Sequence, residues 1–330
     1  MKGKTGNHKE AEYSWGYKKP EDDNRTLKEK IRIAFYNPST GTVLGRTPLD
    51  WGRLLLFYIL LYLALALLFA ICMKGLLLTI DLKHPKWILE ESIIGTNPGM
   101  GYRPMPKMAE DGKSLVWYQA NNKSNVAMWE ESINAFLKPY MNEHEFTNRI
   151  FCDYDMPKPS EDKVCEVYIN ETSWGPCTKR NHYSFPSSSP CVFLKLNRIY
   201  GWTPEYYEDL SSLPPEMPSN LRSFIENEKA IDPRRMNTIW VSCNPETPFD
   251  NETMGEVEYY PRQGFPGYYY PYKNQDGYLS PLIAVRFKRP PVGILVNVEC
   301  RAWAKNIIYQ RPTGAKDRQG SVHFEILVDP

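Results

Sequence analysis

The sequence lacks the motifs that most enzyme classes require. Its five histidines are scattered, and none belongs to a zinc-binding HExxH motif. The chain has no GxSxG nucleophile elbow and no phosphate-binding glycine loop. It also lacks a close Cys-x-x-Cys pair with histidines spaced to complete a zinc site. We therefore expect no catalytic residues, no cofactor and no metal in this chain.

An excess of charge of one sign is also missing. The chain has 40 Lys and Arg against 39 Asp and Glu, which leaves a formal net charge of +1. A basic balance is the electrostatic signature of nucleic-acid binding. We expect no nucleic-acid partner.

The chain has one long hydrophobic run, residues 54–73, with twenty residues and no charge. A helix rises about 1.5 Å per residue, so this run is long enough to cross a hydrocarbon core of about 30 Å. A buried core helix would normally show a polar stripe, and a signal peptide would not follow 53 mostly polar residues. The run predicts a single-pass membrane anchor in contact with lipid.

The residues on either side of the run favour one orientation. Residues 1–53 carry eleven Lys and Arg against seven Asp and Glu, the bias of a cytoplasmic segment. Of seven cysteines, Cys72 lies in the run and six follow it. Even numbers of cysteines on one side are typical of an oxidised extracellular domain. Three N-x-S/T sequons lie on the same side, at Asn122, Asn170 and Asn251.

These patterns divide the chain into three parts. The expected parts are a cytoplasmic tail over 1–53, a transmembrane helix over 54–80, and an extracellular, disulfide-bonded, glycosylated domain over 81–330. Residues 1–30 are polar and are expected to form a mobile tail, and 31–37 a short strand or membrane-adjacent coil. The last part is long enough for one domain with its own core.

Short strands dominate the expected secondary structure of the last part. Apolar runs with turn residues between them predict strands at 192–196, 238–241, 282–287, 294–302 and 322–328. One amphipathic helix is expected over 127–140. The fold class expected is a single transmembrane helix plus a mainly-β domain, an immunoglobulin-like β-sandwich with one flanking α-helix and long loops.

Two tyrosine-bearing features are candidate interaction surfaces. Tyr58 and Tyr62 are four residues apart, so they share one face of the membrane helix, where a hydroxyl favours a protein neighbour over lipid. Residues 258–272 hold six tyrosines among proline and glycine. Such a segment is either a recognition surface or a loop folded onto its own domain. Trp51 precedes the span as an interfacial residue.

Several motifs together resemble the β subunit of the sodium/potassium-transporting P-type ATPases. They are Phe35-Tyr36-Asn37, Leu44-Gly45-Arg46-Thr47 with Trp51, Tyr58 with Tyr62, Lys163-Val164-Cys165, the run from Pro190-Cys191 through Gly201-Trp202, Tyr269-Tyr270-Pro271-Tyr272, 282–287, and Glu299-Cys300-Arg301-Ala302. The resemblance covers the chain from about residue 35 to its end. Arg32 and Ala34 depart from the apolar residues usual before the first motif. Thr178-Lys179, directly after Cys177, replace the small residues usual at that point.

The resemblance implies specific roles for residues. The six cysteines alone allow fifteen pairings, and the resemblance implies Cys152–Cys165, Cys177–Cys191 and Cys243–Cys300. It implies that the catalytic α subunit is contacted by Trp51, Tyr58, Tyr62, Tyr269, Tyr270 and Tyr272. It also implies a hetero-oligomer at the plasma membrane, with the N-terminus cytoplasmic, in which a small single-span regulatory subunit is a further partner.

The function implied is that of a non-catalytic subunit. Such a subunit supports folding and plasma-membrane delivery of the α subunit and modulates K⁺ and Na⁺ transport. Two alternatives share the same fold: a β subunit of the proton/potassium ATPase, and a pump-independent protein of cell adhesion or junctions. An ectoenzyme is disfavoured because no catalytic constellation is present.

Overall fold

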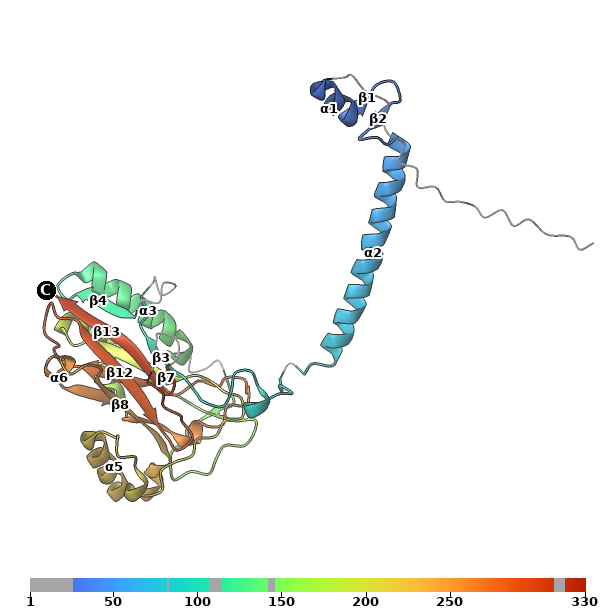
Figure 1. Cartoon of the computed structure of the whole chain (residues 1–330). Coiled ribbons are helices and arrows are strands. Elements are labelled where there is room, and N and C mark those ends of the chain that lie inside the picture. The colour runs from blue at the N-terminus through green and yellow to red at the C-terminus, as the bar shows by residue number, and fades with distance from the viewer. Residues whose placement is uncertain (1–25, 82, 107–113, 142–145, 312–317) are drawn as a thin grey trace, which may run out of the picture. The chain divides into compact units, whose positions relative to one another are not determined.

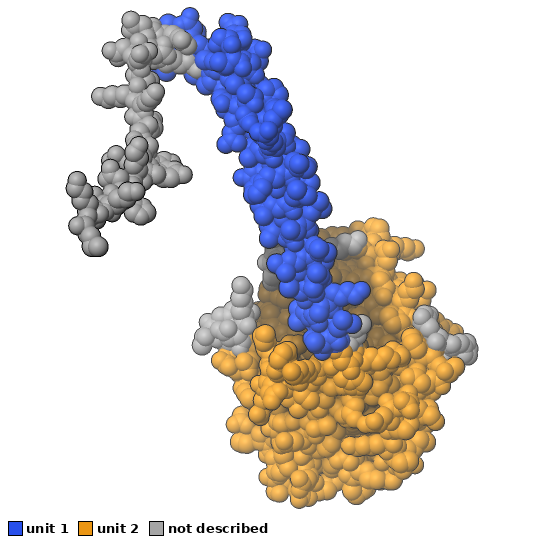
Figure 2. All heavy atoms as spheres, turned by 90° about the vertical axis from the view of Figure 1, so that its right-hand side faces the viewer, with its two compact units in different colours: residues 1–80 blue, residues 81–330 orange. Residues whose placement is uncertain are grey.

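The computed structural model describes residues 26–81, 83–106, 114–141, 146–311 and 318–330, in two compact units. Unit 1 ends at Ile80 and unit 2 runs from Asp81 to Pro330 (Figures 1 and 2). Most of the tail expected to be mobile, residues 1–25, lies outside the described residues.

The described part of unit 1 begins with helix α1 (Leu27–Phe35), which includes residues 31–35, where a strand or coil was expected. Apolar residues at 27, 31, 34 and 35 follow helical spacing. The apparent alternation over 31–37 is part of this helical pattern. Thr26 and Glu29 form a capping box, with the Thr26 N–H donating to Glu29 Oε2 at 3.2 Å. The prediction for 31–35 was therefore wrong. Strands β1 (Tyr36–Asn37) and β2 (Thr42–Val43) then form a hairpin.

The membrane helix is α2 (Pro48–Leu78), which has 31 residues. It begins six residues before the uncharged run because Thr47 caps it, accepting from the Asp50 N–H at 3.3 Å, and Pro48 occupies its first turn. Within the described residues, this is the one helix long and apolar enough to span a membrane. None of its residues is buried within the chain, as expected of a helix whose side chains contact lipid or a partner helix.

Unit 2 is a sandwich of two sheets (Figure 1). The five-stranded sheet has the order β10-β8-β12-β13-β4, and the four-stranded sheet has the order β3-β7-β11-β9. The strands of the first sheet are β4 (Leu115–Gln119), β8 (Thr238–Pro245), β10 (Gly264–Pro266), β12 (Val296–Trp303) and β13 (Ser321–Asp329). Those of the second are β3 (Met100–Arg103), β7 (Cys191–Leu196), β9 (Val257–Tyr260) and β11 (Ile283–Phe287).

The remaining elements are short apart from two helices. The longer helices are α3 (Lys123–Met141) and α5 (Ser219–Ile231). The short elements are η1 (Leu89–Glu91), β5 (Arg149–Ile150), β6 (Val164–Cys165), α4 (Glu171–Trp174), η3 (Lys179–Ser187), η4 (Leu210–Ser212), η5 (Pro233–Met236), α6 (Asp250–Thr253) and η6 (Gly267–Tyr269). The mainly-β fold with one membrane helix agrees with the expectation.

The main core lies between the two sheets. In β12 the even-numbered residues from Val296 to Ala302 are buried, and they alternate with partly exposed residues. Phe287 of β11 packs edge-on against Phe324 of β13, with 5.8 Å between ring centroids, which joins the two layers. The strict two-residue alternation is why β12 was recognisable from sequence.

Both sheets are also covered on part of their outer faces. On the four-stranded sheet, Phe193 of β7 stacks on Trp174 and meets Tyr183 edge-on, with centroid distances of 5.8 and 5.7 Å. On the five-stranded sheet, α5 residues Leu221 and Ile225 form a second buried cluster with Trp240 and Trp303. Helix α5 was not expected from the sequence, because only two of its residues are buried and a proline-rich segment precedes it.

Candidate partner-binding surfaces

One face of α2 carries the three aromatic residues singled out in the sequence. Trp51, Tyr58 and Tyr62 line a shallow apolar groove with aliphatic residues of the same face. The Tyr58 and Tyr62 rings stack with centroids 6.2 Å apart, and their side chains are 46% and 63% exposed. Tyrosine hydroxyls at membrane depth need an acceptor that lipid does not provide. This face therefore has the chemistry of a contact with another membrane helix.

The hairpin before α2 explains the motif around Trp51. The Trp51 indole N–H donates to the Val43 carbonyl at 2.8 Å, and the Leu44 N–H donates to the Phe35 carbonyl at 3.2 Å. The chain reverses at Leu44 and Gly45, both with positive φ, before Thr47 caps the helix. Trp51 thus fastens the hairpin to the first turn of α2. Sequence reasoning missed this role because it considered Trp51 only as an interfacial or partner-facing residue.

The tyrosine-rich segment folds largely against its own domain. The Tyr269 hydroxyl donates to the Glu166 carbonyl at 3.0 Å, and the Tyr270 ring meets Trp202 edge-on at 5.7 Å. Burial raises the pKa of Tyr269 and of Tyr270 well above the ordinary value. Tyr272 is half-buried, stacked near Arg198, whose guanidinium carbon lies 5.3 Å from the ring centroid. Each of the three residues is still partly exposed, and that exposed surface is what remains for a partner.

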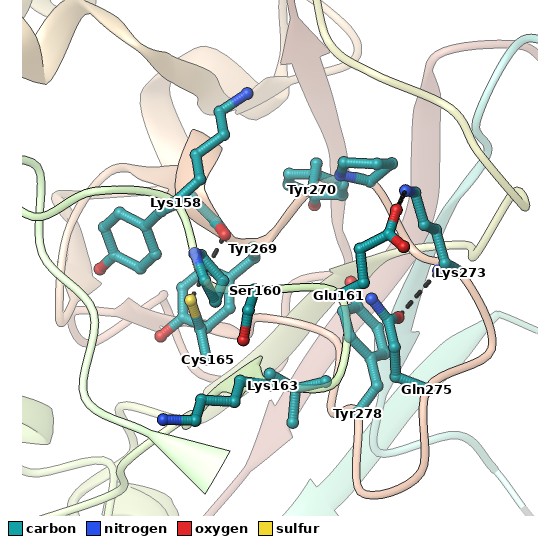
Figure 3. Close-up of a pocket in the computed structure, with 14 residues that line it drawn as sticks. Lys158, Ser160, Glu161, Lys163, Cys165, Tyr269, Tyr270, Lys273, Gln275 and Tyr278 are labelled. Atoms are coloured by element: carbon teal, nitrogen blue, oxygen red, sulfur yellow. Dashed lines mark hydrogen bonds and ion pairs between the residues drawn. The ribbon is translucent and has the colours of Figure 1, made fainter. Parts of the chain in front are cut away.

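A cavity of about 170 Å³ lies beside this segment (Figure 3). Its lining includes Cys165, Tyr269 and an ion pair in which Lys273 Nζ lies 2.9 Å from Glu161 Oε1. The hydrogen bond and charge of Lys273 lower the pKa of the Glu161 carboxyl. This ion pair joins the segment that precedes β6 to the end of the tyrosine-rich segment.

The described residues contain no group of three His, Cys, Asp or Glu side chains able to hold a metal ion. One charged cluster was missed by sequence reasoning. Arg318 lies between Glu246, at 2.6 Å, and Glu299, and His323 also contacts Glu246. Glu299 and His323 are register partners on β12 and β13. They lie side by side because of a strand register that the sequence does not reveal. Arg318 donates hydrogen bonds to both carboxylates and offsets part of their negative charge, which is typical of a structural network.

The structure joins the six cysteines of unit 2 in the three pairs that the resemblance implies. The S–S distances are 2.03 Å for Cys152–Cys165, 2.07 Å for Cys177–Cys191 and 2.08 Å for Cys243–Cys300. Cys243 and Cys300 are register partners on adjacent strands β8 and β12, so this bond lies within one sheet. Cys72 is free and exposed on α2.

The three sequon asparagines all lie at short turns or helix starts. Asn122 is exposed directly before α3, and its Oδ1 accepts from the Ser124 N–H at 3.2 Å. Asn170 is half-buried and caps α4, accepting from the Ser173 N–H at 2.6 Å. Asn251 is exposed in α6. Two of the three amides are therefore open to solvent.

Comparisons with known proteins now bear on this arrangement. A family model described as "Sodium / potassium ATPase beta chain" matches residues 21–324. The chain belongs to this family. The chain is 45% identical to "Sodium/potassium-transporting ATPase subunit beta-2" of Drosophila melanogaster over 317 residues, which cover 95% of each chain. It is 45% identical to subunit beta-1 of the same organism over 302 residues, 92% of this chain and 94% of that one.

The likeness extends beyond insects. The chain is 33% identical to "Probable sodium/potassium-transporting ATPase subunit beta-3" of Caenorhabditis briggsae over 303 residues, 91% of this chain and 87% of that one. Membership of the sodium/potassium ATPase β chain family makes this a non-catalytic subunit of an ion-transporting ATPase, with a single membrane span.

Proposed function

We propose that this chain assembles with the catalytic α subunit of a sodium/potassium ATPase, supports its folding and delivery to the plasma membrane, and modulates K⁺ and Na⁺ transport. The observation that carries the proposal is the exposed aromatic face of α2. None of the residues of α2 is buried, and lipid alone offers its two neighbouring tyrosines no hydrogen-bond acceptor. The relatives are sodium/potassium-transporting ATPase subunits by name, which favours a sodium/potassium partner over a proton/potassium one.

The contact residues proposed are Trp51, Tyr58 and Tyr62 in the membrane and the exposed edges of the tyrosine-rich segment outside it. Tyr269, Tyr270 and Tyr272 each keep intermediate exposure. Aromatic side chains that already pack against their own domain bind a partner at low entropic cost, because their rotamers are already fixed. A small single-span regulatory subunit remains a further proposed partner.

The membrane contact is tested by replacing both tyrosines with leucine. Tyr58→Leu with Tyr62→Leu keeps the helix apolar but removes both hydroxyls, and an interhelical hydrogen bond is worth roughly 0.6–2 kcal/mol. We expect altered K⁺ dependence of pump activity and lower detergent stability of the complex, with membrane insertion unchanged. The measurements are K⁺-activated ATPase activity and thermal inactivation in detergent.

A matched control lies on the other side of the same helix. Leu56 and Leu60 are also four residues apart but lie about half a turn away from the tyrosines. Leu56→Ala with Leu60→Ala removes more volume and is expected to leave K⁺ dependence unchanged. Wild-type behaviour of the tyrosine variant, or an equal effect in the control, would contradict the assigned face.

We propose a type II orientation, with residues 81–330 extracellular and the N-terminus cytoplasmic. Cysteines able to form disulfides and all three sequons lie after α2. Treatment with an N-glycosidase is expected to lower the apparent mass in steps, and Asn122→Gln and Asn251→Gln are each expected to remove one step. The same treatment of a variant without the three asparagines is the control. Unchanged mobility of wild-type protein from secretory-competent cells would reject this orientation.

A further inference from the structure

The segment that opens unit 2 exposes large apolar side chains to an unusual degree. Trp87 is 65% exposed, Ile93 is 106% exposed and Ile94 is 79% exposed. They lie on either side of η1 within eight residues of one another. Neighbouring exposed apolar side chains of this size mark an interaction site rather than ordinary surface. We call Trp87, Ile93 and Ile94 the juxtamembrane patch.

The segment that carries the juxtamembrane patch packs against the domain. Leu89, between its members, packs against the main core. Consecutive turns follow, with the Ser92 N–H donating to the Leu89 carbonyl at 3.0 Å and the Gly95 N–H to the Ser92 carbonyl at 3.1 Å. Leu89 therefore points inward while the patch residues remain outside, so their exposure is a property of a folded segment.

Asn97 ties the same segment to a distant part of the chain. Its amide donates to the Ile308 carbonyl at 2.9 Å, and its Oδ1 accepts from the Ile308 N–H at 3.0 Å. The Ile308 side chain is itself 62% exposed. The bidentate contact places a further exposed isoleucine beside the segment that carries the patch.

Chain length limits how far the patch lies from the membrane. Helix α2 ends at Leu78, and only eight residues separate it from Trp87. At no more than about 3.3–3.6 Å per residue, that connection spans less than about 35 Å even when fully extended. The patch therefore stays tethered near the bilayer surface from which α2 emerges.

The side chains around the patch match a lipid headgroup region. Tryptophan concentrates at membrane–water interfaces because its ring is apolar and its N–H is polar. Lys86 Nζ lies 5.4 Å from the Trp87 ring centroid, where it can meet lipid phosphates. Glu90 and Glu91 are exposed between the apolar residues, which disfavours strongly anionic lipid and suits a zwitterionic surface.

We propose that the juxtamembrane patch inserts into the headgroup region of the bilayer spanned by α2, as a second membrane contact of this chain. The contact holds the start of unit 2 against the lipid surface. It goes beyond assembly with an α subunit, since its occupant is a zwitterionic lipid such as phosphatidylcholine. A protein partner seated on the patch is the rival outcome of the test.

The test is a spin-label depth measurement on the full chain, co-expressed with an α subunit and reconstituted in phosphatidylcholine nanodiscs. In a Cys72→Ser background, a nitroxide is attached at Ile94→Cys, with a second label at Ile93→Cys in a separate variant. The matched control is Ile231→Cys, an isoleucine 65% exposed at the end of α5, which lies at a different corner of the domain from the η1 region (Figure 1).

Collision rates with oxygen and with a water-soluble nickel chelate distinguish the outcomes. Lipid insertion predicts, at positions 93 and 94, several-fold higher oxygen accessibility than nickel accessibility, and the reverse at position 231. High nickel accessibility at 93 and 94 would show that the patch faces water and would overturn the proposal. Protection from both reagents would show a protein on the patch. An oxygen preference at all three positions would show unspecific adsorption. Either result would also overturn the proposal.

Discussion

Loss of the Cys243–Cys300 disulfide is expected to damage this protein more than loss of either other disulfide. The bond closes a sequence separation of 57 residues, against 13 and 14 for the other two. In the chain-entropy model the long loop contributes about 4 kcal/mol and each short loop about 3 kcal/mol. Cys243 and Cys300 lie in the main core, as do Cys177 and Cys191, so the loop length carries the ranking. Since a domain is typically stable by about 5–15 kcal/mol, the long bond is a large fraction of the total.

Three double variants measure this ranking. Alanine replaces both cysteines of one pair at a time, because an unpaired serine hydroxyl in the core would add a cost of its own. We expect the Cys243/Cys300 variant to have the lowest thermal midpoint and to bring the least α subunit to the cell surface. Equal midpoints in all three variants, or a lower one in a short-loop variant, would contradict the ranking. A peptide map that links Cys243 to any residue except Cys300 would reject the pairing itself.

Phe193→Ala is expected to destabilise the domain by about 3–5 kcal/mol. Phe193 is fully buried in β7, stacked on Trp174 and edge-on to Tyr183. Its ring therefore attaches the irregular segment around α4 and η3 to the outer face of the four-stranded sheet. Removing it leaves a cavity that rigid aromatic neighbours fill only in part.

The effect of Phe193→Ala is measured as the change in free energy of unfolding or thermal midpoint of the purified chain. Phe151→Ala is the control, since the Phe151 side chain is 69% exposed and its removal is expected to change stability by less than about 0.5 kcal/mol. Phe193→Leu is expected to fall between the two. A midpoint for Phe193→Ala close to that of Phe151→Ala would mean that the outer layer contributes little to folding.

Local patterns predicted the regular parts of the fold well. The alternation around Val298 and Cys300 predicts β12, and the helix expected over 127–140 corresponds to α3 over Lys123–Met141. The start of α3 was placed late because Asn122, which accepts from the Ser124 N–H, was considered only as a sequon. Boundaries depend on such caps, whereas the existence of an element depends on its periodicity.

The candidate site was only partly predictable, because it depends on contacts between distant residues. Spacing alone placed Tyr58 and Tyr62 on one face of α2. Spacing did not show that Trp51 bonds to Val43, or that Tyr269 turns its hydroxyl to Glu166. The dense tyrosines of 258–272 have the same composition whether they bind a partner or their own domain, so only the fold separates the two.

Co-purification tests the central claim most directly. The chain, tagged at its N-terminus, is co-expressed with a sodium/potassium ATPase α subunit, extracted in mild detergent and separated by size, with subunit beta-1 of Drosophila melanogaster treated in parallel. The account predicts that α co-elutes with this chain in constant proportion and shows K⁺-dependent ATPase activity. If the chain reaches the cell surface and elutes alone while the control retains α, the account is contradicted.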